Sequence, residues 1–312
     1  MGTGGSVDGR LLAGTGARRW FPPCDRAWHT GGHDRHQVLH PGRRTAPADT
    51  NALDAGVATQ RDRGPGTERA RLAPMAWTRF SLAGAAGAAL DADAVRYGPG
   101  IPTESELTLL CRVDGRRILE LSCGAGANAV TLAKAGARVI AVDDVADNLA
   151  DTRERAAREE VRVEAHHGPL AELAFVRADT IDAALSAYGL ATVDDLGRVF
   201  RQVHRVLRSD RPFVFSLPHP AFVMLDPAGG EPVLRRPWWE AGPIPWSVGD
   251  GRADPDRAVT LSELFGGLSR AGFGVDALLE PQAERDTAGD AWSDAMRWVP
   301  PTLIVRARKL GI

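Results

Sequence analysis

Between residues 117 and 307, short runs of apolar residues alternate with longer segments in which apolar residues recur every three or four positions. Short apolar runs bounded by glycine, proline or carboxylates are typical of buried strands, and the longer spacing is typical of helices. The pattern predicts seven strands, at residues 117–121, 139–143, 161–165, 181–186, 212–217, 273–279 and 302–307. Such alternation favours a mostly parallel α/β sheet with helices on both faces and ligands at the carboxyl ends of its strands.

The clearest helical pattern covers residues 193–208. Its apolar stripe consists of Leu196, Val199, Phe200, Val203, Val206 and Leu207. Asp194 and Asp195 fall in the first turn and Arg205 and Arg208 in the last, where each charge complements the helix dipole. The pattern predicts one amphipathic helix between the fourth and fifth strands.

A glycine-rich turn follows the first strand, in the stretch ILELSCGAGANAVTLAKAGARVIAVDD at residues 118–144. Gly124 and Gly126 let the backbone turn sharply and approach a ligand closely, and the helix that begins near Ala127 directs its free N–H groups at that ligand. Asp143 ends the second strand, where a carboxylate can accept the hydroxyl groups of a ribose. These features predict an adenosine-containing cofactor.

Two cofactor classes fit this turn. Gly124, Gly126 and Ala129 satisfy the G-x-G-x-x-G/A pattern of dinucleotide-binding proteins, which makes NAD(P) an alternative. Glu120 ends the first strand just before the turn, and its carboxylate would repel a pyrophosphate but suit the cationic amino group of a methionine moiety. Glu120 therefore favours S-adenosylmethionine.

Four stretches resemble the motifs of the class I S-adenosylmethionine-dependent methyltransferases, in the same order along the chain. They are LELSCGAGAN, AVDDVADNL, DTIDAALSAYGL and DDLGRVFRQVHRVLRSDRPFVFSLPHP, within residues 97–219. The resemblance implies a Rossmann-like, doubly wound sheet of seven strands in the order 3-2-1-4-5-7-6, with the last strand antiparallel. It also implies S-adenosylmethionine as the cofactor.

The cofactor site that follows from the turn and the resemblance is formed by Tyr97, Glu120, Ser122, Cys123, Gly124, Ala125, Gly126, Asn128, Asp143, Asp144, Asn148, Gly168, Pro169, Leu170, Ser186, Ala187 and Tyr188. Two positions depart from the family pattern. Ser122 stands where a glycine is common, which is tolerable if its φ is not positive. Pro169 stands where an acidic residue often receives the adenine amino group, so only the amide of Leu170 is left to serve the adenine.

The resemblance implies methyl transfer to a small molecule by in-line displacement, for which an enzyme mainly aligns the nucleophile and excludes water. If a general base is needed, His219 after the fifth strand is the best candidate. The alternative is that His219, between two prolines, shapes a turn. Tyr188 is expected to line the methyl donor or the acceptor, and Tyr97 to cover the cofactor from the N-terminal side.

Substrate choice is assigned to a Trp- and Pro-rich insertion at about residues 224–256. Its prolines and glycines argue against regular structure, and Trp238, Trp239 and Trp246 offer flat apolar surfaces. We expect a lid over an apolar or aromatic acceptor. A loop packed on the sheet is the alternative.

The first 74 residues differ from the rest, with 11 arginines, no lysine and little apolar periodicity. They are expected to be disordered, and the methyltransferase domain to span residues 75–312. Potential metal ligands occur at Cys24, His29, His33, His36 and His40, but without the paired spacing of a zinc site. The adjacent His166 and His167 would point to opposite faces of a strand. No metal site is predicted.

Charge and composition narrow the function further. Residues 1–74 carry a net charge of +4 and the remainder −6, without a basic stripe, so a nucleic-acid partner is not expected. No apolar run approaches the length of a membrane span, and an odd number of cysteines fits free thiols in the cytoplasm. We expect a cytoplasmic monomer or homodimer with a small-molecule partner. An inactive binding or regulatory protein and an NAD(P)-dependent oxidoreductase are the alternatives.

Overall fold

The computed structural model describes residues 77–78, 94–225, 232–234, 237–239, 246–247, 257–288 and 292–311. All of them belong to one unit of the chain. The segment 1–74, with its candidate metal ligands, lies outside the described residues. The domain boundary at residue 75 therefore stays a prediction.

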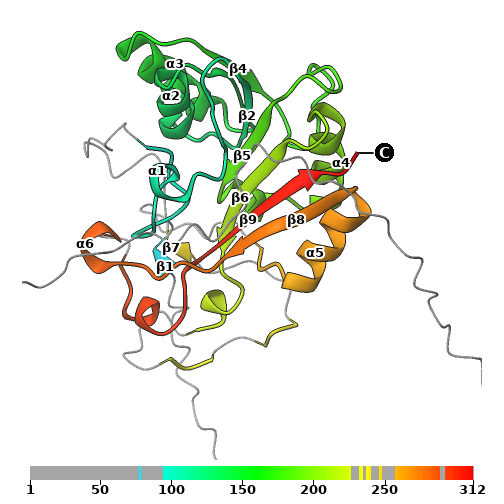
Figure 1. Cartoon of the computed structure of the whole chain (residues 1–312). Coiled ribbons are helices and arrows are strands. Elements are labelled where there is room, and N and C mark those ends of the chain that lie inside the picture. Colours follow the sequence, from blue (N-terminus) through cyan, green and yellow to red (C-terminus); the bar gives the residue numbers. More distant parts are fainter. Residues whose placement is uncertain are drawn as a thin grey trace, which may run out of the picture. The chain divides into compact units, whose positions relative to one another are not determined.

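A seven-stranded sheet forms the centre of this unit (Figure 1). Its strands are β2 (Arg117–Leu121), β3 (Arg138–Asp143), β4 (Val163–His167), β5 (Ala183–Ala187), β6 (Pro212–Pro218), β8 (Phe273–Leu279) and β9 (Thr302–Lys309). They lie in the order β4-β3-β2-β5-β6-β9-β8, and only β9 runs antiparallel to its neighbours. This confirms the predicted order 3-2-1-4-5-7-6 with an antiparallel last strand.

Two predicted strands begin later than expected. β4 starts at Val163 rather than at residue 161, because the amide of Val161 donates to Ala156 O and closes the preceding helix. β5 starts at Ala183, because Ile181 forms only an isolated bridge to Leu207. The other five strands lie within two residues of their predicted limits.

Helices cover both faces of the sheet. One face packs against α2 (Ala127–Lys134), α3 (Ala146–Arg158) and the segment that contains α1 (Glu104–Leu107). The opposite face packs against α4 (Leu196–Val206) and α5 (Leu261–Arg270). A short helix, α6 (Arg285–Ala288), follows β8. Apolar burial on both faces is therefore what holds this sheet between its helices.

Helix α4 is shorter than the predicted 193–208. It begins after Asp195, whose carboxylate accepts from the amide of Arg198 at 2.8 Å, so this aspartate is the N-cap rather than a first-turn residue. It ends before Leu207, which has an extended backbone. The predicted stripe is still the packing face, since Val199, Phe200, Val203, Val206 and Leu207 are buried against β6 and its neighbours.

Three further observations bear on the sequence-based expectations. Trp246–Ser247 forms a two-residue strand, β7, that pairs in parallel with β1 (Trp77–Thr78), so the Trp- and Pro-rich segment is not wholly irregular.

The cysteines differ in state. Cys123 is a free, buried thiol, but Cys111 is disulfide-bonded. The expectation of free thiols is thus wrong at Cys111, because an odd number of cysteines still permits one pair. Within the described part of the chain, no helix has both the length and the apolar character needed to cross a membrane.

Candidate functional site

The glycine turn between β2 and α2 has two glycines with different surroundings. Both adopt positive φ, 52° at Gly124 and 75° at Gly126. A Cβ atom added at Gly126 would lie 2.7 Å from side-chain atoms of Thr152, whereas one added at Gly124 would meet no atom within 4 Å. Gly126 is therefore required by packing, and Gly124 leaves one side of the turn open to a ligand.

Ser122 also adopts a positive φ, 55°. From the sequence, Ser122 is expected to be tolerable on the condition that its φ is not positive. The structure shows a positive φ, so this expectation is wrong. The left-handed conformation costs a non-glycine residue about 1–2 kcal/mol. It is held in place by the hydrogen bond from Ser122 N to Val142 O, at 2.8 Å, which joins the turn to β3. Backbone strain of this kind concentrates at ligand-binding sites.

Glu120 is completely buried at the end of β2. Neither of its carboxylate oxygens has a hydrogen-bond partner among the residues that the structure describes. Burial raises the pKa of Glu120 well above its usual range, and the charge of Asp143 raises it further. A buried carboxylate without a partner is costly, so this position fits a cationic group supplied by a ligand.

Asp143, at the end of β3, is buried and accepts three hydrogen bonds. Its Oδ2 accepts from the amide of Gly124 at 2.9 Å, and its Oδ1 accepts from Val145 N and Asn148 Nδ2, both at 3.0 Å. The carboxylate thus fastens the glycine turn to β3 and to the start of α3. With two lone pairs on each oxygen, only Oδ2 keeps an acceptor position for a ribose hydroxyl. The neighbouring Asp144 is exposed.

The loop after β4 brings three predicted site residues to the same edge of the sheet. Gly168 N donates to Asp143 O at 3.0 Å, and a Cβ at Gly168 would face open space. Pro169 is exposed and Leu170 is buried. Gly168 therefore places this loop directly beside the ribose-binding candidate.

The two adjacent histidines of β4 diverge, as the strand geometry predicts. His166 Nε2 lies 2.6 Å from Glu164 Oε1 and its ring stacks on Phe175, while His167 Nε2 lies 3.0 Å from Asp144 O. In the parts of the chain that the structure describes, no group of three His, Cys, Asp or Glu residues could hold a metal ion.

Three predicted residues near the turn are held by protein contacts. Asn128 is buried, and its side-chain amide accepts from Arg96 N at 2.9 Å and donates to Arg96 O at 3.0 Å. Ala125 O accepts from Arg155 Nε at 3.0 Å. Burial raises the pKa of the Cys123 thiol, and the charge of Glu120 adds to this effect. Cys123 therefore stays protonated and packs beside the turn, rather than acting as a nucleophile.

The end of β5 is fixed to its neighbours by side-chain hydroxyls. Ser186 Oγ donates to Leu121 O at 2.9 Å, and Ala187 is buried beside it. Tyr188 has a positive φ of 62°, and its hydroxyl lies 2.6 Å from Thr302 Oγ1. Tyr188 therefore links β5 to β9 across the carboxyl edge of the sheet.

His219 is buried immediately after β6, and both of its ring nitrogens are engaged. Nδ1 accepts from the amide of Ala221 at 3.1 Å, so Nε2 carries the proton and donates to Glu280 Oε1 at 2.9 Å. The backbone of His219 also donates to Pro301 O. This arrangement shapes the turn and leaves no ring nitrogen open to a substrate.

Two of the three predicted tryptophans line a cavity of about 210 Å³ beside α5. Its lining includes Pro220, Met224, Trp238, Trp239, Val259 and Glu263. Trp239 is 84% exposed. Trp246 lies in β7, and residues 226–231, 235–236, 240–245 and 248–256 of the predicted lid are outside the described residues.

Comparison with known proteins identifies a methyltransferase domain in this chain. A family profile described as "Methyltransferase domain" matches residues 118–210, which run from the second residue of β2 to just beyond α4. A crystal structure of an S-adenosylmethionine-dependent methyltransferase from Mesorhizobium loti is 27% identical, with a TM-score of 0.55 over 64% of this chain and 94% of that chain. Together these matches support a class I S-adenosylmethionine-dependent methyltransferase, as the sequence motifs predicted.

Two further proteins are similar to this methyltransferase. A putative methyltransferase structure from Listeria monocytogenes, 20% identical with a TM-score of 0.55 over 65% of this chain and 95% of that chain, shares the fold. The ubiquinone biosynthesis O-methyltransferase of Azorhizobium caulinodans is 28% identical over 166 residues, which are 53% of this chain. The match spans 61% of that relative's length.

The cofactor of this methyltransferase is S-adenosylmethionine. The site fits it in two respects: Glu120 presents a buried carboxylate that lacks a partner among the described residues, and Gly124 leaves space beside the turn. Several residues that hold the predicted site residues in place were not predicted from the sequence. They are Arg96 at Asn128, Glu104 at Tyr97, Thr152 at Gly124, Glu280 at His219 and Thr302 at Tyr188. Of these, only Glu104 lies in a visible local signal, the T-x-x-E capping box of Thr103 and Glu106.

Proposed function

We propose that the protein transfers the methyl group of S-adenosylmethionine to a small molecule by in-line displacement. The observation that carries this proposal is Glu120, a completely buried carboxylate without a hydrogen-bond partner among the described residues. A cationic amino group would relieve that cost, whereas a pyrophosphate would raise it. The same residue therefore argues against the NAD(P)-dependent alternative.

Each part of the site has a role in this proposal. Glu120 would bind the amino group of the cofactor, the amides of the glycine turn and the start of α2 would bind its carboxylate, and Asp143 would accept one ribose hydroxyl. The loop Gly168–Leu170 would hold the adenine. The bound cofactor supplies a methyl group that its sulfonium already activates. The protein's contribution is to orient the acceptor and exclude water.

The cavity beside α5 is the proposed acceptor site. Trp238, Trp239 and Met224 supply an apolar wall, and Pro220 places the cavity next to the end of β6. An apolar or aromatic small molecule fits these surfaces. We expect Trp239→Ala to weaken acceptor binding and leave cofactor affinity unchanged. Equal loss of both, or of neither, would contradict this assignment.

A general base is not required by the geometry. The lone pair on His219 Nδ1 is taken by the amide of Ala221, so His219 would have to exchange this hydrogen bond before accepting a proton. The proposal therefore rests on alignment rather than on proton abstraction. An acceptor that deprotonates in solution, or that loses its proton after transfer, is consistent with this site.

Calorimetry with S-adenosylmethionine, S-adenosylhomocysteine and NAD tests the proposed cofactor role directly. We expect both sulfur compounds to bind and NAD to fail. Glu120→Gln should weaken S-adenosylmethionine binding by about tenfold or more, as expected for one charge-assisted hydrogen bond in a buried site. The matched control is Glu172→Gln, at an exposed position on the loop after β4.

The outcomes separate the remaining functions. Binding of neither sulfur compound by the wild type would overturn the proposal, and binding of NAD would restore the oxidoreductase. Binding without incorporation of labelled methyl into any member of a metabolite panel would favour an inactive binding or regulatory protein. We propose the domain 75–312 as the active unit, with a small molecule as its partner.

A further inference from the structure

Residues 95–110, here called the strap, cross the carboxyl edge of the sheet and are attached at three points. The backbone of Arg96 is bound on both sides by the Asn128 side chain of α2. The carbonyl of Tyr97 accepts from Ser216 Oγ of β6 at 2.5 Å. Gly98 packs on β9 so closely that a Cβ there would lie 2.5 Å from Thr302 Oγ1.

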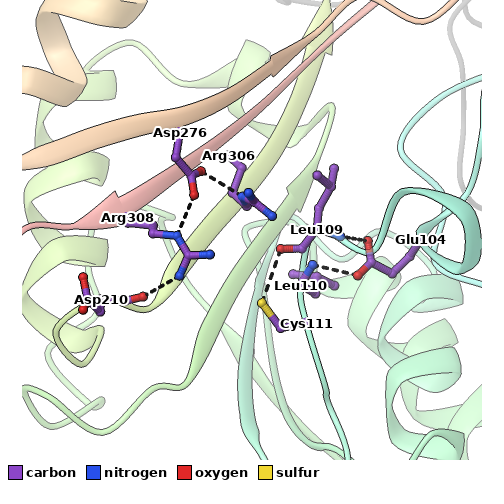
Figure 2. Close-up of polar contacts among 8 residues, drawn as sticks. All are labelled: Glu104, Leu109, Leu110, Cys111, Asp210, Asp276, Arg306 and Arg308. Carbon is purple, nitrogen blue, oxygen red and sulfur yellow. Dashed lines mark hydrogen bonds and ion pairs between the residues drawn. The ribbon is translucent and has the colours of Figure 1, made fainter. Parts of the chain in front are cut away.

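Glu104 closes the strap on itself. Its amide donates to Val95 O at 2.9 Å, and its carboxylate accepts from the Tyr97 hydroxyl at 2.6 Å. The same carboxylate accepts from Leu109 N at 2.9 Å and Leu110 N at 2.7 Å (Figure 2). One side chain thus joins the beginning, middle and end of the strap.

A buried cation of the sheet also influences Glu104. Arg306 is buried in β9, and its Nε donates to Asp276 Oδ1 of β8 at 2.8 Å (Figure 2). Burial raises the pKa of Glu104, while the hydrogen bonds from Tyr97, Leu110 and Leu109 and the charge of Arg306 oppose that shift. Burial likewise raises the pKa of Tyr97, which keeps its hydroxyl a donor.

We propose that Glu104 is a positioning residue for cofactor binding: by holding Tyr97 and the end of the strap together, it keeps the strap closed against the glycine-turn helix. Asn128, where the strap is attached, lies two residues after Gly126. Thr302, under Gly98, bonds to Tyr188 at the end of β5. A displaced strap would therefore shift the wall of the site both at α2 and at the end of β5. This inference rests on the proposed function.

The test compares Glu104→Gln with Glu106→Gln, the matched control in the same short helix. Glu106 is exposed, and its side chain bonds to Thr103 in the capping box. A glutamine at 104 cannot accept on both ends of its side chain, so it loses the hydrogen bonds at one end. We expect the dissociation constant for S-adenosylhomocysteine to rise about tenfold in Glu104→Gln and to stay within about twofold in Glu106→Gln.

Hydrogen exchange of residues 95–102, measured without any ligand, reports whether the strap is closed independently of cofactor binding. Faster exchange is expected in Glu104→Gln and not in Glu106→Gln. If Glu104→Gln does not fold, Tyr97→Phe removes one of the three hydrogen bonds that the carboxylate accepts and should show the same two changes at smaller size. Faster exchange with unchanged affinity would mean that Glu104 only stabilises the strap, and unchanged exchange would overturn the proposal. If the wild type binds no sulfur nucleotide, the proposed function fails and the positioning role with it, while the exchange result still decides whether Glu104 closes the strap.

Discussion

Ser122 and Gly189 are packed so closely that a Cβ atom at Gly189 would overlap Cβ of Ser122. Ser122 belongs to the glycine turn after β2, and Gly189 begins the 3₁₀ helix after β5. Each follows a strand of the same parallel pair, β2 and β5. The positive φ of Ser122 and the missing side chain of Gly189 are therefore parts of one arrangement at the carboxyl edge of the sheet.

This arrangement predicts a suppressor. Gly189→Ala should lower the free energy of unfolding by about 1–3 kcal/mol, because the added methyl group overpacks the contact with Ser122. Ser122→Gly removes the atoms that clash and relieves the positive φ, so the double variant should recover most of that loss. Urea unfolding of the four proteins in a double-mutant cycle measures the coupling. Additive effects would show that the two positions do not share this contact.

Glu120 predicts a stability that depends on pH. The pKa of Glu120 is raised in the folded protein, so between the ordinary carboxyl pKa and that raised value the native state holds a proton that the unfolded chain has released. Native stability contributed by this group is therefore fully present below the ordinary pKa and is lost as pH rises. Glu120→Gln has no such proton to lose. We expect it to match the wild type at about pH 4 and to be more stable by about 2 kcal/mol at about pH 8.

Thermal or urea unfolding of the ligand-free proteins across this pH range checks the prediction. The same variant is expected to bind S-adenosylmethionine more weakly, so stability and binding should change in opposite directions. A Glu120→Gln variant that is less stable at every pH would show that the carboxylate has a partner in the protein.

The two glycines of the turn should respond differently to alanine. Gly126→Ala places a methyl group 2.7 Å from the side chain of Thr152 and 2.9 Å from its Cα, so it should destabilise the fold by about 3 kcal/mol. Gly124→Ala meets no neighbouring atom and should cost only the positive-φ strain, about 1 kcal/mol. Because its methyl group would fill the open side of the turn, it should weaken cofactor binding more than stability. Unfolding measures the loss of stability and calorimetry the loss of cofactor affinity in both variants. If Gly124 did not face the ligand, Gly124→Ala would lose no more cofactor affinity than stability.

The fold could be predicted from the sequence because its signals are local. Apolar runs give the strands of a buried parallel sheet, and the stripe of α4 gives the packing face of a covering helix. The errors occur where a single contact decides a boundary. Val161 completes the end of α3 instead of starting β4, and Asp195 caps α4 instead of entering it.

The site was predictable in part for the same reason. The glycine turn, Glu120 and Asp143 lie at the ends of predicted strands, where parallel-sheet topology brings them together. The contacts that set their geometry join residues far apart in the chain, such as Tyr188 with Thr302. Neither local periodicity nor residue type specifies which hydroxyl meets which across the sheet. The positive φ of Ser122 likewise depends on packing between distant parts of the chain, which the sequence alone does not specify.

His219 gives the last prediction, because its two possible roles respond differently to asparagine. In His219→Asn, the introduced side-chain oxygen can accept from the amide of Ala221 as Nδ1 does, but it cannot take up a proton near neutral pH. If His219 shapes the turn, methyl transfer should stay within about threefold of the wild type, whereas loss of a general base lowers rates by about 10²–10⁴-fold. We expect the small effect, since both ring nitrogens are engaged. Glu280→Gln, which alters only the partner of Nε2, should change the rate still less, and a large loss in both variants would establish the pair as the base.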